Sequence, residues 1–406
     1  MTKKPILATK WTCTGCMACV DICTPKALVP IEEIDGHLYV KWEKESCISC
    51  EACTKVCPIV NKYSFRNDLK HSKPYAGWAK NDSLRMKSSS GGAFAAIAEF
   101  FLLKGWYVAG AVQDDLSVKH LITNKIEDLE KLQNSKYQQG QLAGIYKQAR
   151  FILTKGNKLL FSGTSCQVAG LYSFLGEKKY LKNLYTIDLV CSGFTSILPL
   201  RTFLRNEPYQ IESISYRNKE NGWVNNEGEI VCQSITAYTS DRTIDYGKNI
   251  IYSAFFSHLT IRNSCINCKF AFLHRKSDIT LADFWGDKDF PNEHFKGISA
   301  IVSHSIKGYE LLNNSKVIFY PTEWEKILSK NYRLVVGRIR FYKYHPIRLL
   351  YPFIFKHCSY KFIKKLFDGK QRNILWFPYR IMYSIIYRIS VYYLKMDFNR
   401  NLSNSF

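Results

Sequence analysis

Two groups of four cysteines near the start of the chain have the spacing needed to bind iron–sulfur clusters. Within each group the cysteines are separated by two, two and three residues; the groups are Cys13, Cys16, Cys19 and Cys23, then Cys47, Cys50, Cys53 and Cys57. Thiolates are soft ligands that suit such clusters, and in a paired arrangement the fourth cysteine of each group binds the other cluster. We therefore assign the first [4Fe–4S] cluster to Cys13, Cys16, Cys19 and Cys57, and the second to Cys47, Cys50, Cys53 and Cys23. Structural zinc, the alternative, usually uses two separated Cys-x-x-Cys pairs and fits this repeat poorly.

Four later cysteines could bind a third cluster. Cys166 and Cys191 each follow the carboxyl end of an expected strand, and a helix joins the two strands. Strands joined in this way run parallel, so both thiols should lie at one edge of the sheet, where α/β folds place their sites. With Cys265-x-x-Cys268 they supply four ligands for a third [4Fe–4S] cluster; alternatively, Cys166 and Cys191 are buried small hydrophobic residues. The two remaining cysteines, which we expect to be structural or incidental, are Cys232 and Cys358.

The region that must position these later cysteines alternates helical and strand patterns. The expected helices are 93–103, 126–132, 141–154 and 167–176. The expected strands are 106–112, 158–161, 184–190, 212–217, 229–237 and 277–284. This order predicts a mixed sheet covered by helices. Residues 63–87, which hold Pro74 and many charged side chains, are interpreted as a polar connector.

A serine- and glycine-rich turn, residues 88–92, precedes the first of these helices. Such a turn at a helix start exposes backbone N–H groups to the pyrophosphate of a nucleotide cofactor, and Lys87 adds positive charge. An ordinary capped helix is the alternative, and the turn taken alone favours it. The turn therefore needs support from other segments before it indicates a cofactor site.

Five further motifs supply that support, and with the turn they make six. In chain order they are Ser88-Ser-Ser-Gly-Gly92, Ser135-Lys-Tyr137, Gly163-Thr-Ser-Cys166-Gln, Asp188-Leu-Val-Cys191-Ser-Gly193, Arg262-Asn-Ser-Cys265-Ile-Asn-Cys268 and Arg275-Lys-Ser-Asp278-Ile-Thr-Leu-Ala-Asp283-Phe-Trp285-Gly286. Together they resemble the coenzyme F420 hydrogenase/dehydrogenase beta-subunit family over residues 1 to about 330. The chain departs from the family pattern at Ser165, where proline is usual, and at Ser192, where histidine is frequent. These departures concern the substrate more than the fold.

The resemblance implies a flavin. In this family FAD exchanges electrons with the clusters and a hydride with an organic partner. The residues then expected to bind FAD are Ser89, Ser90, Gly91, Gly92, Lys136 and Asp283. Two alternatives remain open: Lys136 is a solvated loop lysine, and Arg275, Asp278 and Asp283 form structural ion pairs. The catalytic residues are not identified.

The charge balance is strongly basic and favours acidic partners. The 406 residues carry 57 Lys and Arg against 34 Asp and Glu, a formal net charge of +23, and more than half of that charge lies in residues 333–406. This tail mixes cations with aromatic residues and places Ile381, Ile385 and Ile389 at helical spacing. Such a pattern is typical of a helix at an anionic membrane surface, of a helical subdomain packed on the core, or of a nucleic-acid binder. Nucleic acid is disfavoured, because no helix-turn-helix, zinc-finger or RNP motif is present.

Four regions are expected along the chain, of mixed α+β and α/β class. They are a dicluster [4Fe–4S] ferredoxin-type domain at 1–62, a region like the N-terminal part of the beta subunit at 63–160, an α/β region with the third cluster at 161–332, and a basic, aromatic, helical extension at 333–406. The second and third regions together would form the flavin-binding domain. No apolar leader opens the chain and charge breaks its longest apolar stretches, so we expect a cytoplasmic protein that contacts at most the inner face of the cell membrane.

The function expected from these features is that of an iron–sulfur flavoprotein oxidoreductase. Electrons would pass between the clusters and FAD, and a hydride would move to or from an unidentified organic substrate, with a lipid-linked envelope or polysaccharide precursor as one candidate. The partners would be a redox protein or reduced carrier and that substrate. The alternative is a non-catalytic electron-transfer subunit that serves a partner enzyme. Neither the direction of electron flow nor the use of F420 follows from the sequence.

Overall fold

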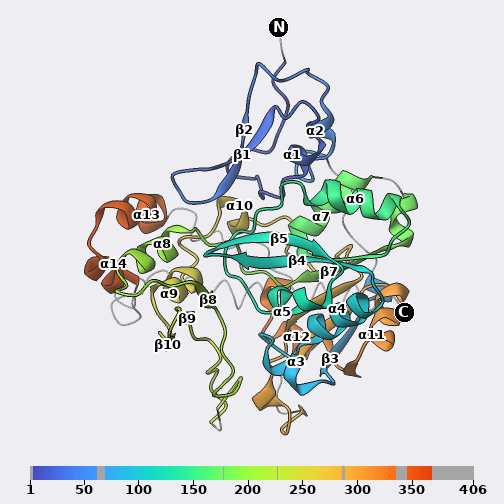
Figure 1. Ribbon diagram of the computed structural model, residues 1–406, viewed down its shortest axis with the longest axis vertical. Helices are drawn as coiled ribbons and strands as arrows, with labels where there is room; N and C mark the ends of the chain where they lie inside the picture. The colour runs from blue at the N-terminus through green and yellow to red at the C-terminus, as the bar shows by residue number, and fades with distance from the viewer. Residues whose placement is uncertain are drawn as a thin grey trace.

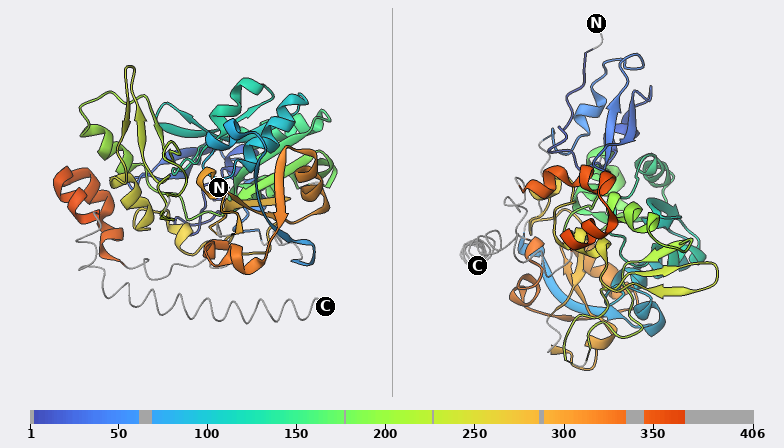
Figure 2. Two further views of the ribbon diagram at one scale, coloured as in Figure 1. Left: turned by 90° about the horizontal axis from the view of Figure 1, so that it is seen from below. Right: turned by 90° about the vertical axis from the view of Figure 1, so that its left-hand side faces the viewer.

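The structure is a computed structural model that describes residues 3–61, 69–176, 178–225, 227–285, 289–334 and 345–367. A small N-terminal domain projects from one end of a larger α/β body (Figure 1, Figure 2). Beside the main sheet of that body lies a smaller group of helices and short strands (Figure 1). The mixed α/β fold and the small N-terminal domain predicted from the sequence are confirmed.

A β-hairpin and two short helices form the N-terminal domain. Its elements are α1 (Ala18–Ile22), β1 (Leu28–Glu32), β2 (Leu38–Trp42) and α2 (Ala52–Lys55), and β1 pairs antiparallel with β2. A residue in the left-handed conformation precedes each helix, Met17 before α1 and Glu51 before α2. Left-handed backbone turns the chain sharply, so each cysteine loop folds back before its helix begins.

Eight strands form the main sheet in the order β13-β3-β12-β11-β7-β6-β4-β5. They are β3 (Lys73–Ala79), β4 (Tyr107–Asp114), β5 (Ser117–Thr123), β6 (Leu159–Thr164), β7 (Leu184–Leu189), β11 (Ile279–Asp283), β12 (Ser299–Ser303) and β13 (Val317–Pro321). Neighbours among β4, β6, β7 and β11 pair in parallel, whereas the outer strands pair antiparallel. The parallel centre sets the carboxyl ends of β6 and β7 side by side, as the sequence predicted.

Helices cover both faces of this sheet. One face carries α3 (Asp82–Met86), α4 (Ala93–Leu103), α5 (Leu129–Leu132) and α11 (Ile306–Asn314); the other carries α6 (Ile145–Thr154) and α7 (Ser165–Leu175), with α12 (Trp324–Leu328) under β3 and β12. Successive strand residues face opposite sides, so Val108 packs in the core with α4 while Ala109 packs in the core with α6 and α7. Met17 and Ala18 of the N-terminal domain share this second core, which joins that domain to the body.

A separate hydrophobic core holds the smaller group together. The elements of this group are α8 (Leu198–Arg205), α9 (Ile250–Phe256), α13 (Pro346–His357), α14 (Tyr360–Phe367) and the three-stranded sheet of β8 (Ser213–Ser215), β9 (Thr236–Tyr238) and β10 (Thr243–Asp245). The short helix α10 (Asn263–Ile266) lies between this group and the N-terminal domain (Figure 1). Short 3₁₀ turns occur at Leu69–His71, Ile126–Asp128, Lys178–Lys182, His294–Lys296 and Tyr332–Leu334.

Several predicted elements need correction. Residues 63–87, interpreted as a polar connector, contain β3, a mostly buried strand that pairs with β12 and β13. The helix predicted at 141–154 begins only at Ile145. The strand predicted at 229–237 is reduced to β9, the central strand of its small sheet, which pairs with β8 and with β10 over three residues each. Ile381, Ile385 and Ile389, which the sequence places at helical spacing, lie outside the described residues. Within the described residues, no helix is long and apolar enough to span a membrane.

Candidate iron–sulfur and cofactor sites

The cysteines of the N-terminal domain gather in the two groups that the spacing predicts. Burial raises the pKa of Cys19, and the nearby thiols of Cys16, Cys13 and Cys57 raise it further. Burial likewise raises the pKa of Cys53, which is also close to Cys23 and Cys50. Cys47 packs in the same small core as Cys23 and Cys53. Cys57 thus lies near the first three cysteines and Cys23 near Cys53, while Cys19 is also close to Cys53. The assignment of the eight ligands to two clusters stays a prediction.

Two contacts hold the first of these groups against the body. The carboxylate of Asp21 in α1 accepts hydrogen bonds from the backbone N–H groups of Gly144, Tyr146 and Lys147, at 2.5, 2.8 and 3.3 Å, and so caps the start of α6. A side chain at Gly170 in α7 would lie 3.0 Å from the sulfur of Cys16. Glycine there lets the cysteine loop pack directly on α7.

Four further cysteines meet near the first turn of the same helix. Burial raises the pKa of Cys166 in the first turn of α7, and Cys268, Cys191 and Cys265 are all close enough to raise it further. The N–H of Gly193 lies 3.3 Å from the sulfur of Cys191, and the N–H of Phe194 lies 3.5 Å from that of Cys265. Donors of this kind stabilise bound thiolates and tune cluster potentials. The third group proposed from the sequence is therefore assembled in space.

The geometry around these thiols differs from that of a single-ion site. Within the described residues, no group of three or more His, Cys, Asp or Glu side chains is arranged to hold one metal ion. A four-iron cube makes a different demand, since each thiolate binds its own iron atom.

A cavity of about 1050 Å³ opens beside the third group. Its wall includes the carboxyl ends of β6 and β7, the start of α4, and Cys191 itself. Of the residues predicted to bind flavin, five line it: Ser89, Ser90, Gly92, Lys136 and Asp283. The sixth, Gly91, is absent from the lining; a side chain there would lie 2.5 Å from the backbone nitrogen of Ser299, so this glycine serves close packing against β12.

The amine of Lys136 is turned toward the backbone. It donates a 2.9 Å hydrogen bond to the carbonyl of Lys131 and a second bond to that of Gln133. Burial lowers its pKa to about 7. Lys136 is therefore a half-buried cavity residue whose amine is held by two backbone carbonyls, which argues against a freely solvated loop lysine.

The sequence did not single out the cation nearest to Asp283. Arg217 lies 2.8 Å from the Asp283 carboxylate, donates a 2.8 Å bond to the hydroxyl of Tyr137 and contacts the carbonyl of Ser89 at 3.3 Å. All four residues line the cavity. The only sequence signal for Arg217 was its place at the end of a strand-like segment.

Comparisons with known proteins identify two domains in the chain. Residues 156–318 match the model of the coenzyme F420 hydrogenase/dehydrogenase beta subunit, C terminus, and residues 12–60 match that of the 4Fe-4S dicluster domain. The chain carries both domains. A chain of the xenon-derivatised F420-reducing [NiFe] hydrogenase complex from Methanosarcina barkeri is similar in fold, at 16% identity and a TM-score of 0.45, covering 67% of this chain and 91% of that one. No curated protein matches the chain.

Two charged residues of the beta-subunit domain are structural. Arg275 pairs with Asp188 at 3.1 Å, and both side chains are 2% exposed. Asp278 accepts a 2.8 Å bond from the backbone N–H of Thr186 and another of 2.8 Å from the hydroxyl of Ser305. Neither residue lines the cavity. The sequence left their role open, and the geometry favours the structural alternative.

Replacing Arg275 by methionine is expected to lower the free energy of unfolding by about 3–5 kcal/mol, because Asp188 would keep a buried charge without its partner. Denaturation of the intact protein, followed by circular dichroism, measures this change. The matched control is Arg242→Met, whose ion pair with Asp241 lies on the surface. A loss no larger than that of the control would contradict the structural role of Arg275.

Proposed function

We propose that this protein is an iron–sulfur flavoprotein oxidoreductase, in which electrons pass between the N-terminal clusters, a third cluster and FAD. The chain is related to a hydrogenase and dehydrogenase subunit family, which supports an oxidoreductase class. FAD, when bound, exchanges single electrons with clusters and a two-electron hydride with an organic substrate. The third cluster would be held by Cys166, Cys191, Cys265 and Cys268.

One observation carries this proposal: the cavity that the flavin motifs line is also lined by Cys191 of the third group. At about 1050 Å³ it lies at the upper end of the size range, roughly 300–1000 Å³, of small-molecule sites. A cofactor in it would lie directly beside a cluster ligand. The residues present therefore fit a flavin that receives electrons from a cluster.

The start of α4 supplies the anion-binding part of this site. Gly92, Ala93, Phe94 and Ala95 line the cavity, and the first N–H groups of a helix have no partner within the helix. These donors and the helix dipole favour a pyrophosphate. Ser89 is fixed beside them by a 2.7 Å bond from the N–H of Ser135.

The path for electrons follows α7. Cys16 of the first group packs on Gly170, and Cys166 of the third group lies four residues earlier on the same helix. One helical turn rises about 5.4 Å, so the two ligand sets are neighbours. From the third group the cavity begins at Cys191.

The proposal is tested by adding a one-electron reductant in small amounts, without oxygen, to the full chain loaded with iron, sulfide and FAD. Cluster and flavin absorption are followed together. The flavin is expected to become reduced through the clusters and to be reoxidised when an acceptor is added. Clusters that become reduced while a bound flavin stays oxidised would overturn the proposal.

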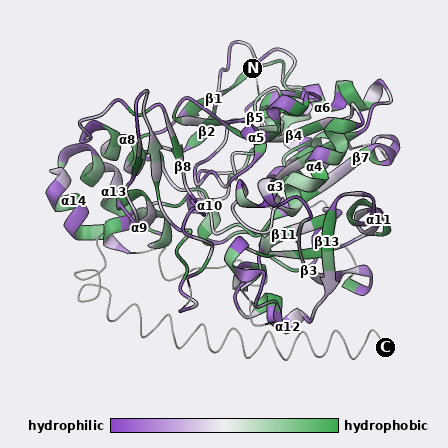
Figure 3. Ribbon diagram, turned by 60° about the horizontal axis from the view of Figure 1, so that its bottom comes forward, coloured by the Kyte–Doolittle hydropathy of each residue, from purple (hydrophilic) through white to green (hydrophobic). Residues whose placement is uncertain are grey.

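A second observation supports an anionic membrane surface as a partner. On α13, Leu349, Leu350 and Phe353 are 62, 54 and 61% exposed, and they share the face opposite the buried Tyr351 and Phe355. Neither α13 nor α14 has an acidic residue. Exposed lysines lie at the end of α13 (Lys356) and on α14 (Lys361, Lys364 and Lys365). Figure 3 shows hydrophobic and hydrophilic residues mixed along both helices. An apolar face among cations fits a membrane interface, and a lipid-linked substrate would fit such a location.

Changing Leu349, Leu350 and Phe353 together to serine is therefore expected to weaken binding to vesicles of anionic phospholipid about tenfold or more, since large apolar side chains would no longer leave water. Sedimentation of the full chain with vesicles measures the change. The control is Ile306→Ser, which removes an isolated exposed residue, 75% exposed, from α11. Equal binding by the triple variant and the wild type would contradict membrane binding through this face. Residues 368–406 would then be the next segment to test.

A further inference from the structure

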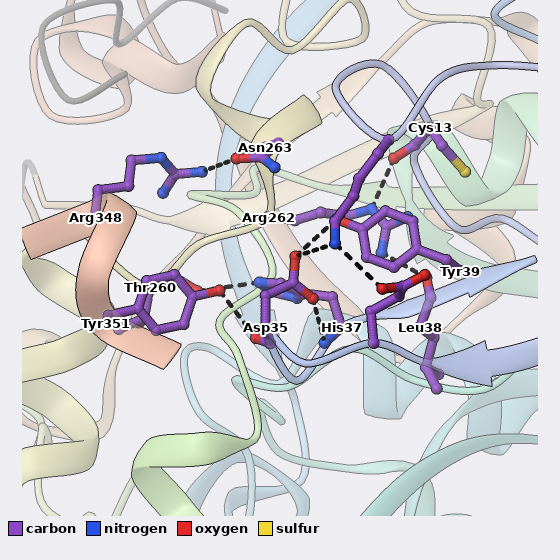
Figure 4. A network of polar contacts seen from close by, with 12 residues as sticks. Cys13, Asp35, His37, Leu38, Tyr39, Thr260, Arg262, Asn263, Arg348 and Tyr351 are labelled. Carbon is purple, nitrogen blue, oxygen red and sulfur yellow. Dashed lines mark hydrogen bonds and ion pairs between the residues drawn. The ribbon is translucent and has the colours of Figure 1, made fainter. Parts of the chain in front are cut away.

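One buried arginine touches both the first and the third cysteine groups. The side chain of Arg262 is fully buried, and its guanidinium donates a 2.7 Å bond to the carbonyl of Cys13 and a 2.6 Å bond to that of Leu38 (Figure 4). It also stacks over the ring of Tyr39, 4.0 Å from the ring centre. The backbone carbonyl of the same residue accepts a 3.0 Å bond from the N–H of Cys265. Arg262 thus joins the loops of the two groups.

Arg348 adds a second buried cation to this region. It is 5% exposed and donates to the carbonyl of Leu259 at 3.1 Å and to the side-chain oxygen of Asn263 at 2.8 Å (Figure 4). Cys265 lies close enough to Arg348 to raise the pKa of its guanidinium. A third, Arg333, is 3% exposed and donates to the carbonyls of Ser192 and Cys265 at 3.2 and 3.3 Å.

The hydrogen-bond acceptors of Arg262 and Arg348 in the described part of the chain are neutral oxygens of carbonyl and amide groups. One terminal nitrogen of Arg262, Nη2, is buried without any acceptor. Asp35, the carboxylate in this network, is engaged by Lys10 at 3.6 Å and by Tyr39 at 3.1 Å. Buried cations cost several kcal/mol unless an anion balances them. Asp35 also lies close enough to Arg348 to raise its pKa. A single carboxylate cannot balance both Arg262 and Arg348, so a further negative charge fits here.

A cube bound by four thiolates supplies such a charge, because it is a net anion and becomes more negative on reduction. Nearby buried cations favour the reduced form and so raise its reduction potential. Arg262 acts on the first cluster as well, since its guanidinium donates to the carbonyl of Cys13, whereas Arg333 and Arg348 lie beside Cys265 of the third group. The side chains of the N-terminal domain itself add less of this effect. Residues 3–61 contain no arginine, and all of their lysines are exposed, where water and salt screen them.

We propose that Arg262 and Arg348, together with Arg333, provide the balancing charge of the third cluster and give it the highest reduction potential of the three. This inference rests on the third cluster of the proposed function and adds a direction of electron flow. With the clusters bound, one electron would pass from a reduced N-terminal cluster, which would be oxidised, to the third cluster, which would be reduced. The initial donor is a reduced one-electron carrier protein, and the cavity lies at the downhill end. Arg262 and Arg348 are positioning residues in this scheme, since they act through the cluster.

The test is a potentiometric titration of the full chain, purified without oxygen and followed by electron paramagnetic resonance. The third-cluster signal is assigned as the one lost in Cys191→Ser. We expect this signal to appear first as the potential is lowered. In Arg262→Gln and in Arg348→Gln, each loaded with as much iron as the wild type, it should move to lower potential, while the signal of the cluster held by Cys47, Cys50 and Cys53 stays in place. Arg262→Lys, which keeps the charge, should restore the original potential.

Two controls separate the possible failures. Arg201→Gln removes an exposed arginine paired with Glu32 and should leave every potential unchanged. An unmoved third-cluster potential in both glutamine variants, or a third cluster that is reduced last, would overturn the charge-balance inference and leave the cluster itself standing. Only about eight irons in the wild type, the content of two cubes, would overturn the third cluster and this inference with it.

Discussion

Replacing Cys191 by serine is expected to remove about a third of the bound iron and to stop the transfer of electrons from the N-terminal clusters to the flavin. A serine oxygen is a harder ligand than a thiolate and suits an iron–sulfur cube poorly. The eight N-terminal cysteines are untouched, so the two N-terminal clusters should persist. Iron analysis shows the first effect, and anaerobic reduction of the flavin by a one-electron donor shows the second.

Cys358→Ser is the matched control. Cys358 is partly buried at the end of α13 and is far in sequence from the other cysteines. It should keep the full iron content and the full rate of flavin reduction. A Cys191→Ser protein with wild-type iron would show that this thiol is a packing residue. Loss of iron with an unchanged rate of flavin reduction would place the electron path elsewhere.

Replacing Ser89 by aspartate is expected to weaken flavin binding roughly a hundredfold. The new carboxylate would lie in the cavity beside the start of α4, where a pyrophosphate would bind. Two unit charges about 5 Å apart repel by about 3 kcal/mol at the effective dielectric of a protein surface. The control is Ser89→Asn, because asparagine has nearly the same shape as aspartate but no charge. Both aspartate and asparagine can accept the hydrogen bond that the N–H of Ser135 now donates to Ser89.

Equilibrium dialysis of the unloaded protein against FAD separates these two variants without any substrate. Binding by Ser89→Asn close to that of the wild type, and weak binding by Ser89→Asp that falls further at low salt, would support a pyrophosphate at α4. Equal affinity of the two variants for FAD would show that the phosphates lie elsewhere in the cavity.

Local signals explain what the sequence predicted well. The spacing of the eight N-terminal cysteines is set within a few residues, and it identified the dicluster domain that the family model also matches. The helix at 93–103 was placed correctly because Gly92 and Gly105, both at positive φ, mark its ends. The convergence of Cys166 and Cys191 followed from a general rule of parallel strands rather than from neighbouring residues.

Features that depend on distant partners could not be read from the chain. β3 contains Pro74 and Gly77 and follows a charged stretch, and it becomes a buried strand only because β12 and β13 pair with it. The role of Arg217 depends on its ion pair with Asp283, and that of Arg262 on its hydrogen bond to the carbonyl of Cys13, whose loop is far away in sequence. Gly91 sits in a phosphate-binding pattern but is required by the backbone of Ser299. Long-range packing, rather than local preference, decided each of these.

The most direct test of the account is a count of iron, sulfide and flavin in the protein purified without oxygen, combined with a visible spectrum taken before and after acid releases the flavin. The account predicts about twelve irons, as in three four-iron cubes, and one FAD per chain. About eight irons without flavin would contradict it. That result would leave the N-terminal clusters alone and make the protein an electron carrier that serves a partner enzyme.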